Sequence, residues 1–480
     1  MENINKNHIL FIFIISFLFV LPILISNTYY LDDMGRTLYG YDGFKENGRY
    51  LSSLIISIFS FGFPLSNPGP LSQVFASFLV FLGAYILTLR FDRSMEGWKR
   101  VLMSTSFILN PCFLEVLSFN FDSITISSSV LLLCLAVYYY DLSLKGSCCF
   151  VFFTLMCLMS YQASISLLIG IVMLTYVFDL NRSFKYSLIN LSTKAFLVIL
   201  SYLLYKIIYI YISSGNSEVE YRGETIFFAG EFIEALSFSI KENLAVGLSI
   251  IHGKDRHIYY LFIFLFIISP LYIIERKEIK TYIAKMTLSY FMLIGIFLST
   301  FIIQSLLKHS VVAARVFVSY SSVTFICLLV VTRLRWKAAR NFFLIIFILH
   351  SFIMASIYSR LLESHDRHYE NIAQSLKIDI GKISVNHGDN EKFLIRGKPP
   401  VSLDFAIAEK KIPFFRYLIQ EYIDNNYLWG YMVLKIKGVY INNPGPEEMK
   451  VDGCKETGIE SEWYNICKKD DVYIINFKEK

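Results

Sequence analysis

The sequence predicts an α-helical polytopic membrane protein that carries a small α/β or α+β domain at its C-terminal end. Hydrophobic residues make up 55% of the 480 residues and charged residues only 18%, and 43 Phe with 32 Tyr are spread through long uncharged runs. This composition excludes an ordinary soluble protein. From residue 359 onward the composition becomes that of a soluble domain. We therefore divide the chain into a multi-spanning membrane domain, residues 1–358, and a C-terminal domain, residues 359–480.

The membrane domain contains about eleven apolar runs that are long enough, at roughly 17–25 residues, to cross a bilayer as helices. The first run is predicted to be retained, because residues 1–8 are only weakly basic and no small-residue cleavage site follows it. The runs are 9–26, 71–89, 101–117, 123–140, 147–161, 163–179, 187–212, 258–274, 281–303, 311–332 and 341–358.

Lys and Arg side chains gather in alternate connections between these runs. By the positive-inside rule such connections lie in the cytoplasm, and so does the N-terminus. The loops 27–70 and 213–257 and the C-terminal domain are then predicted to face outward. Because these connections account for the net charge of +6, that charge does not indicate nucleic-acid binding. The basic residues are Arg90, Arg93, Lys99, Arg100, Arg182, Lys185, Arg276, Lys277, Lys280, Arg333, Arg335, Lys337 and Arg340.

Two segments of the outward loops are predicted to lie on the membrane surface. Residues 51–63 are apolar but too short to span, and Pro64 ends the helical pattern. We predict an interfacial or re-entrant helix there, which presses the loop 27–70 onto the membrane. The loop 213–257 mixes acidic residues with aromatic pairs. It is expected to form a second amphipathic lid over the same face.

The C-terminal domain shows both helical and strand patterns. Residues 406–424 have helical spacing, whereas 431–441 and 472–477 read as strands. Cys454 and Cys467 are the two cysteines of this domain, and outside the cytoplasm they are candidates for a disulfide. The remaining cysteines lie in or beside apolar runs and are expected to be buried thiols.

The loop after the first apolar run holds the main candidates for chemistry, which are Asp32, Asp33, Arg36 and Arg49. Sugar transfer from a polyprenyl-phosphate donor needs a base for the acceptor hydroxyl and cations for the leaving phosphate. Adjacent aspartates point in different directions, so one of them is expected to be the base. Arginine forks bind phosphate oxygens in pairs. An alternative stays open: Asp32 caps a helix that begins at Asp33, with Arg36 neutralising it one turn later.

Five further polar residues lie near the outward ends of apolar runs: Glu115, Asp122, Tyr161, Gln162 and Arg315. We expect them to complete the substrate pocket beneath the loop, since charged groups near hydrocarbon are usually functional. Each has a simpler alternative. The two carboxylates can be solvated among lipid headgroups, the Tyr-Gln pair can belong to the aromatic belt, and the arginine can snorkel to the interface.

No pattern in the sequence supports a metal or a nucleotide cofactor. The stretch His365-Asp366-Arg367-His368 lacks a third ligand at matching spacing, and we interpret it as a solvated helix face. The chain has no Walker loop, no GxGxxG before a helix and no nucleophile elbow. We therefore name no metal site. The use of a divalent metal stays open, without support from the residues.

Six short segments of the membrane domain form a recognisable set. They are Tyr30-Leu-Asp-Asp-Met-Gly-Arg36, Gly40-Tyr-Asp-Gly43, Asn47-Gly-Arg49, Asn110-Pro-Cys-Phe-Leu-Glu115, Phe121-Asp-Ser123 and Tyr161-Gln-Ala-Ser164. Together they resemble the glucosyl transferase II family, whose members glucosylate O-antigen and convert serotype. Phe44 and Tyr50 stand where Trp and Pro are expected, and Ala314 precedes Arg315 where Pro is expected.

The resemblance implies a GT-C-like glycosyltransferase in the bacterial inner membrane, with its C-terminal domain in the periplasm. It implies undecaprenyl-phosphate glucose as donor, lipid-linked O-antigen of lipopolysaccharide as acceptor, and contact with membrane lipid. Asp32 or Asp33 is then the base, and inversion by a single displacement is the simplest mechanism.

Two other functions stay open. An O-antigen or capsule polymerase also has many spans and outward loops, but it does not need the aspartate pair in the first loop. A flippase or transporter of polyprenyl-linked glycan requires polar groups along a path through the midplane. Here the charged residues gather at the outer ends of the runs, while the midplane stretches are Phe, Leu and Ile. This distribution favours the enzyme.

Overall fold

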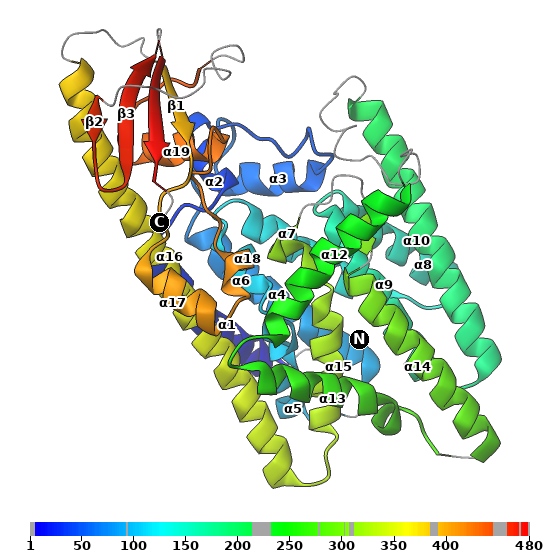
Figure 1. The fold of residues 1–480 in the computed structure, drawn as a ribbon. Coiled ribbons are helices and arrows are strands. Elements are labelled where there is room, and N and C mark those ends of the chain that lie inside the picture. Colours follow the sequence, from blue (N-terminus) through cyan, green and yellow to red (C-terminus); the bar gives the residue numbers. More distant parts are fainter. Residues whose placement is uncertain are drawn as a thin grey trace.

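Apolar helices run side by side through most of the molecule, and a small sheet domain stands at one end of the bundle (Figure 1). The computed structural model describes residues 5–92, 95–213, 232–276, 279–301, 303–306, 312–384, 392–444, 458–469 and 472–478.

Eight helices in the described part of the chain are long and apolar enough to cross a membrane. Each overlaps one of the apolar runs predicted from the sequence, which confirms the helical membrane class, whereas the count of eleven is not confirmed. The helices are α1 (Lys6–Ser26), α4 (Leu71–Phe91), α7 (Asp122–Tyr139), η2 with α9 (Gln162–Asp179), α10 (Phe184–Ser213), α13 (Arg256–Ile273), α14 (Ile279–Phe301) and α16 (Lys337–Ser384).

The other three predicted spans are short or broken in the structure. Pro111 has no backbone N–H and ends a helical run. Irregular backbone at membrane depth persists where protein buries it, and residues 104–118 are buried throughout. The segments are α5 (Gly97–Met103), η1 (Ser104–Leu109), α6 (Phe113–Ser118), α8 (Leu144–Leu158), η5 (Ala314–Phe317) and α15 (Tyr320–Thr332).

Asn110 joins the interrupted segment 97–118 to the interrupted segment 314–332. Its side chain is fully buried, and its Nδ2 donates to the Phe317 carbonyl at 3.1 Å and to Ser321 Oγ at 3.1 Å. Its Oδ1 accepts from the backbone N–H of Cys112 at 3.0 Å. The amide therefore satisfies backbone groups that each interrupted helix leaves without a partner.

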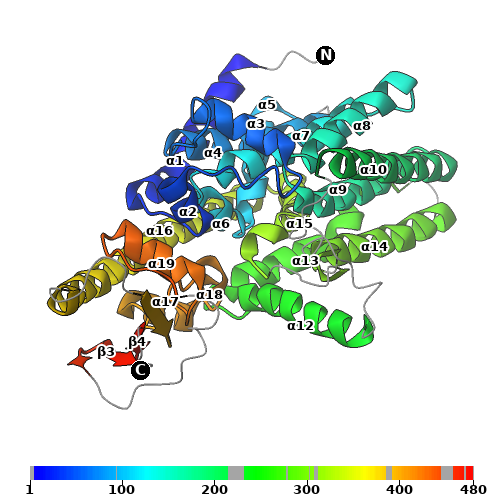
Figure 2. The same ribbon diagram turned by 90° about the horizontal axis from the view of Figure 1, so that it is seen from above.

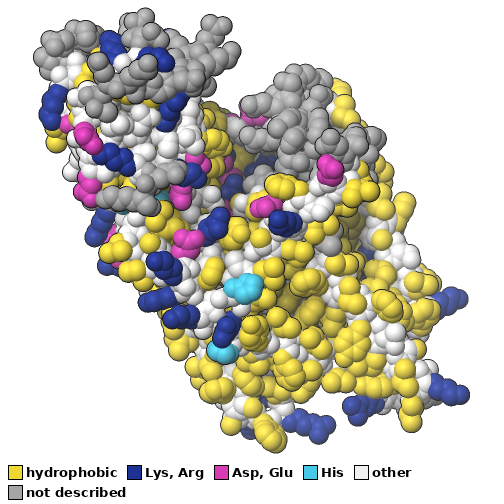
Figure 3. Space-filling view, in the orientation of Figure 1, with side chains coloured by type: hydrophobic (Ala, Val, Ile, Leu, Met, Phe, Trp, Pro, Cys, Tyr) yellow, Lys and Arg dark blue, Asp and Glu magenta, His cyan; other side chains and the backbone are white. Residues whose placement is uncertain are grey.

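Hydrophobic side chains cover the broad lower part of the molecular surface (Figure 3). Asp and Glu side chains lie in the upper half of this face, while Lys and Arg also mark its lower rim. Seen from above, α8, α10 and α14 lie along one side of the bundle, away from the C-terminal domain (Figure 2). Exposed apolar residues along α10 and α14 fit contact with lipid.

Two short helices form part of the loop 27–70, which follows α1. α2 (Asp32–Tyr39) lies at the end of the bundle below α19, and α3 (Tyr50–Phe59) lies across the same end (Figure 1). The short helix predicted at residues 51–63 is thereby confirmed. In the second loop α12 (Phe232–Ile251) is helical and contacts η4 (Ile303–Leu306). Residues 214–231 of the predicted lid lie outside the described residues.

The C-terminal domain continues from the bundle without a break, because α16 is a single helix of 48 residues. The predicted boundary at residue 358 falls inside this helix. Beyond it, four strands form a sheet in the order β1-β4-β3-β2, in which β1 and β4 are parallel and the other pairs antiparallel. The strands are β1 (Lys392–Arg396), β2 (Ile459–Glu460), β3 (Tyr464–Lys469) and β4 (Val472–Phe477).

The sequence interpretation of this domain was right in one place, right in part in another and wrong in a third. β4 matches the strand predicted at 472–477. α17 (Leu403–Lys411) and α18 (Phe415–Leu418) confirm only part of the helical segment predicted at 406–424, since residues 419–424 are not helical. The strand predicted at 431–441 is wrong, because Leu428–Ile436 form the helix α19. A short continuous apolar run has no periodicity that separates a buried helix from a buried strand.

We expect Asn110→Ala to lower the free energy of unfolding by about 1–3 kcal/mol, since buried carbonyl groups would lose their donor. Thermal unfolding of the purified protein in detergent measures this effect. Asn7→Ala, at an exposed position, is the matched control. Equal midpoints for Asn110→Ala and the control would contradict the bridging role.

Candidate active site

The helix α2 is held between the membrane bundle and the C-terminal domain. It ends at Gly40, which has a φ of 65° and donates its backbone N–H to the carbonyl of Arg36. A Cβ on Gly35 would lie 3.0 Å from Met432 Cε of α19, so only glycine allows this close packing without a shift. Tyr30, just before α2, donates its hydroxyl to the Leu418 carbonyl at 2.7 Å. The C-terminal domain thus fixes the position of α2.

Asp33 fastens α2 to the start of α7. Its carboxylate is fully buried and accepts the backbone N–H of Asn120 at 2.6 Å and of Phe121 at 3.2 Å. These N–H groups directly precede α7, where a helix lacks internal partners. Burial raises the pKa of the Asp33 carboxyl to about 8, and the bond from Asn120 opposes that rise. This carboxylate holds two segments of backbone together.

Asp122 is shared by two arginines. Arg36 Nη1 forms a buried ion pair with Asp122 Oδ2, and Arg49 Nη1 lies 3.7 Å from Asp122 Oδ1. The guanidinium of Arg36 also stacks over Phe44 at 4.2 Å from the ring centroid. Because the Asp122 side chain is only 7% exposed, the alternative of a solvated headgroup-zone carboxylate is wrong.

Gln162 and Tyr161 hold Arg49 from the other side. Arg49 Nε donates to Gln162 Oε1 at 3.1 Å, and the guanidinium lies 4.9 Å from the Tyr161 ring centroid. Gln162 Nε2 in turn donates to the Asn47 carbonyl and to the hydroxyl of Tyr205 on α10, each at 2.8 Å. The structure thus brings the predicted pair into contact with Arg49. Tyr205 was missed, because it is one of five tyrosines in α10 and nothing in the sequence distinguishes it from the others.

Glu115 and Arg315 form the second buried pair. Glu115 Oε1 lies 2.6 Å from Arg315 Nη1, and Glu115 Oε2 accepts the Arg315 backbone N–H at 2.6 Å. The arginine packs over the Phe119 ring at 5.1 Å. The snorkelling alternative for Arg315 is therefore wrong, because its side chain turns into the protein and is 17% exposed.

Asp32 differs from the other carboxylates of the site. It is half-buried, and among the described residues no hydrogen bond or ion pair engages its side chain. Its charge nevertheless acts on the guanidinium groups of both Arg36 and Arg315. The helix-cap alternative for Asp32 is wrong, since α2 begins at Asp32 itself and its N-cap position is Leu31. The structure thus leaves one carboxylate accessible beside two cations.

The histidines and cysteines considered for a metal site or a disulfide belong to the C-terminal domain and not to the arginine cluster. Within the described ranges, no three His, Cys, Asp or Glu residues are grouped so that they could hold a metal ion. The interpretation of residues 365–368 as a solvated helix face is wrong for His365, which is buried and contacts the Gln420 carbonyl. His368 contacts the Pro400 carbonyl. Cys467 is disulfide-bonded, and Cys454 lies outside the described residues, so their pairing stays a prediction.

Together, the fold and the site define a helical membrane protein whose interrupted helices collect arginines and carboxylates at one end of the bundle. The chain belongs to the glucosyl transferase GtrII family, because the model of that family matches residues 21–326. This is a family of glycosyltransferases.

One curated relative shares part of the sequence. It is described as an uncharacterized 55.3 kDa protein in the gtrB 5′ region of Salmonella phage P22, and it is 35% identical over 135 residues. The match covers 26% of this chain and 26% of the relative. No solved structure matches the chain.

The pKa of Asp33 predicts a pH dependence of stability. An unfolded Asp has a pKa near 3.9, so between about pH 4 and pH 8 the folded protein binds more protons at Asp33 than the unfolded chain does. The free energy of unfolding of the wild type should therefore fall as pH rises through this window. Asp33→Asn lacks the titrating group. Its melting temperature relative to the wild type should rise between pH 5 and pH 8, and a constant difference would contradict the assignment.

Proposed function

We propose that the protein transfers glucose from undecaprenyl-phosphate glucose to lipid-linked O-antigen of lipopolysaccharide. The reaction takes place on the periplasmic side of the bacterial inner membrane and changes the serotype. Membership of the GtrII family supports a glucosyl transfer. The observation that carries the proposal is the Asp32 carboxylate, which lacks a partner among the described residues and lies within electrostatic reach of Arg36 and Arg315.

Asp32 is the general base in this mechanism. It takes the proton from an acceptor hydroxyl as that oxygen attacks the anomeric carbon of glucose. The bond from this carbon to the phosphate oxygen breaks, and its electron pair leaves with the lipid phosphate. Attack from the opposite face inverts the anomeric configuration. Asp33 supports the reaction indirectly, because its bonds to the start of α7 keep α2 in place.

The arginines stabilise the charge that develops on the leaving phosphate. Arg49 is the most exposed of the three, at 26%, and its contact with Asp122 is long. It is the arginine that can turn to the phosphate with the least rearrangement. Arg36 is held by the ion pair with Asp122 and by the Phe44 ring, so it acts from a fixed position.

The surroundings of Arg49 also fit a lipid-linked donor. Through Gln162 it is joined to Tyr205 of α10, a helix whose other faces expose many apolar side chains. A polyprenyl chain can lie along these side chains in the bilayer while its phosphate reaches the arginine. A transporter would instead need polar groups along the length of the bundle, and here the site residues gather at one end of it.

We expect Asp32→Asn to reduce glucose transfer about 10²- to 10⁴-fold, because general-base assistance is lost. Transfer from labelled undecaprenyl-phosphate glucose to lipopolysaccharide in membranes, normalised to folded protein, is the measurement. Asp33→Asn serves as the comparison: it keeps one acceptor oxygen for the N–H groups before α7, so it should lower transfer per folded molecule far less than Asp32→Asn does. Full activity of Asp32→Asn, or loss of activity confined to Asp33→Asn at equal folded amount, would refute the assignment of the base.

Arg49→Lys should lower kcat/KM for the donor about 10- to 100-fold, since a lysine keeps the charge but loses the paired donors of the guanidinium. The kcat/KM for the acceptor should change much less. Arg367→Lys, at a side chain 72% exposed in the C-terminal domain, is the control. An Arg49→Lys enzyme with an unchanged donor kcat/KM would show that this arginine does not bind the phosphate.

A further inference from the structure

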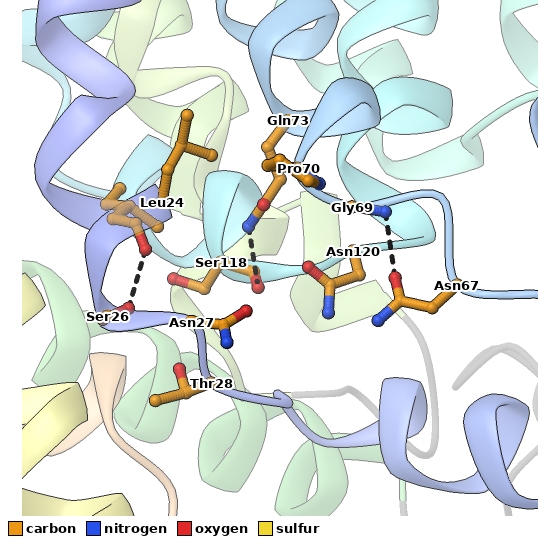
Figure 4. Close-up of a pocket in the computed structure, with 11 residues that line it drawn as sticks. Leu24, Ser26, Asn27, Thr28, Asn67, Gly69, Pro70, Gln73, Ser118 and Asn120 are labelled. Carbon is orange, nitrogen blue, oxygen red and sulfur yellow. Dashed lines mark hydrogen bonds between the residues drawn. The ribbon is translucent and has the colours of Figure 1, made fainter.

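A small polar pocket lies between the end of α1, the loop before α4 and the start of α7 (Figure 4). Its volume is about 110 Å³, and none of the residues that line it is charged. Gln73 and Ser118 form part of its wall, where Gln73 Nε2 donates to the Leu117 carbonyl at 2.9 Å. The pocket is separate from the arginine cluster, yet it borders the same segment that Asp33 holds.

Asn120 connects the pocket to the candidate active site. Its backbone N–H donates to Asp33, while its side chain points into the pocket (Figure 4). The residue is 8% exposed, and in the part of the chain that the structure describes its amide has no hydrogen-bond partner. Because the amide lies in the pocket wall, a ligand or a water molecule in the pocket can supply its hydrogen-bond partners.

Two more polar side chains reach the same space. Asn27 and Thr28 follow the end of α1, face the pocket in Figure 4, and make no side-chain hydrogen bond among the described residues. With Asn120 they present amide and hydroxyl groups that can both donate and accept. A set of this kind, without any charge, fits the hydroxyl groups of a sugar and offers no cation to a phosphate.

We propose that this pocket is a subsite for an uncharged pyranose, with Asn120 and Thr28 as the residues that recognise its hydroxyl groups. The proposal rests on the function proposed above and extends it, because it places one sugar of the reaction on the α1 side of Asp33. The volume admits one edge of a sugar ring. Both the transferred glucose and a sugar of the acceptor glycan have this chemistry, and the experiment separates the two.

Three substitutions test the subsite. Asn120→Ala removes the amide, and Thr28→Val removes the hydroxyl at nearly constant shape. Gly69→Ala leaves both groups in place, but its new Cβ would lie 2.5 Å from Asn120 Oδ1 and so displace that side chain. Gly381→Ala is the matched control, because a Cβ there meets nothing within 4 Å.

Steady-state rates are measured with the donor varied at saturating acceptor, and then with the acceptor varied at saturating donor. Asn120→Ala and Gly69→Ala should raise one of the two KM values about three- to tenfold, as expected for one or two lost hydrogen bonds. Thr28→Val should raise the same KM. The kcat of these variants, and both KM values of the control Gly381→Ala, should stay near those of the wild type. A rise in acceptor KM identifies the acceptor sugar, and a rise in donor KM identifies the glucose.

A binding measurement keeps this proposal distinguishable from the proposed function. Wild type, Asn120→Ala and Asp32→Asn are titrated with lipid-free O-antigen oligosaccharide and with methyl glucoside, followed by intrinsic fluorescence. Sugar binding that Asn120→Ala weakens and Asp32→Asn retains supports the subsite, even if no transfer is observed. Unchanged binding and unchanged KM values in Asn120→Ala would show that the pocket holds only water, and would overturn the proposal.

Discussion

The bonds from the Asp33 carboxylate to two backbone N–H groups are the constraint on which the rest of the site depends. They join α2 to the start of α7 across 87 residues of sequence. Asp122 is the first residue of α7 and pairs with Arg36 of α2, so the same junction also aligns the ion pair. A buried carboxyl group is expensive unless hydrogen-bond donors satisfy its oxygens. The Asp33 oxygens find both N–H donors only when α2 lies in one position relative to the start of α7. These bonds therefore select that one arrangement of the two helices.

Charge balance explains why the arginines can remain near the membrane. Asp122 and Glu115 neutralise Arg36 and Arg315 at short range, while Arg49 shares Asp122 through a longer contact. Removing one member of a buried pair leaves an uncompensated charge, which is far more costly than the loss of a surface pair. The cluster is therefore stable without substrate, and it keeps one cation that an incoming anion can recruit.

The sequence was sufficient to find which polar residues come together in the candidate site. It was insufficient to assign a separate role to each of them. Polar residues at the ends of apolar runs stand out, so Glu115 and Arg315 could be identified without a structure. Which of Asp32 and Asp33 is buried depends on N–H groups far along the chain, which no local pattern reveals. The count of eleven spans stays unconfirmed, because run length does not register an interruption such as that at Asn110. The segment of α19 was misassigned because its packing against α2 decides its conformation.

The continuity of α16 has a mechanical consequence. At 1.5 Å per residue its 48 residues extend about 70 Å, more than twice the hydrocarbon thickness of a bilayer. A helix adjusts to a thicker or thinner bilayer by changing its tilt. Because α16 carries the sheet domain as one rigid rod, such a change would swing α19 relative to α2. The thickness and lipid composition of the host membrane would thereby act on the geometry around Asp32 without any molecule binding there.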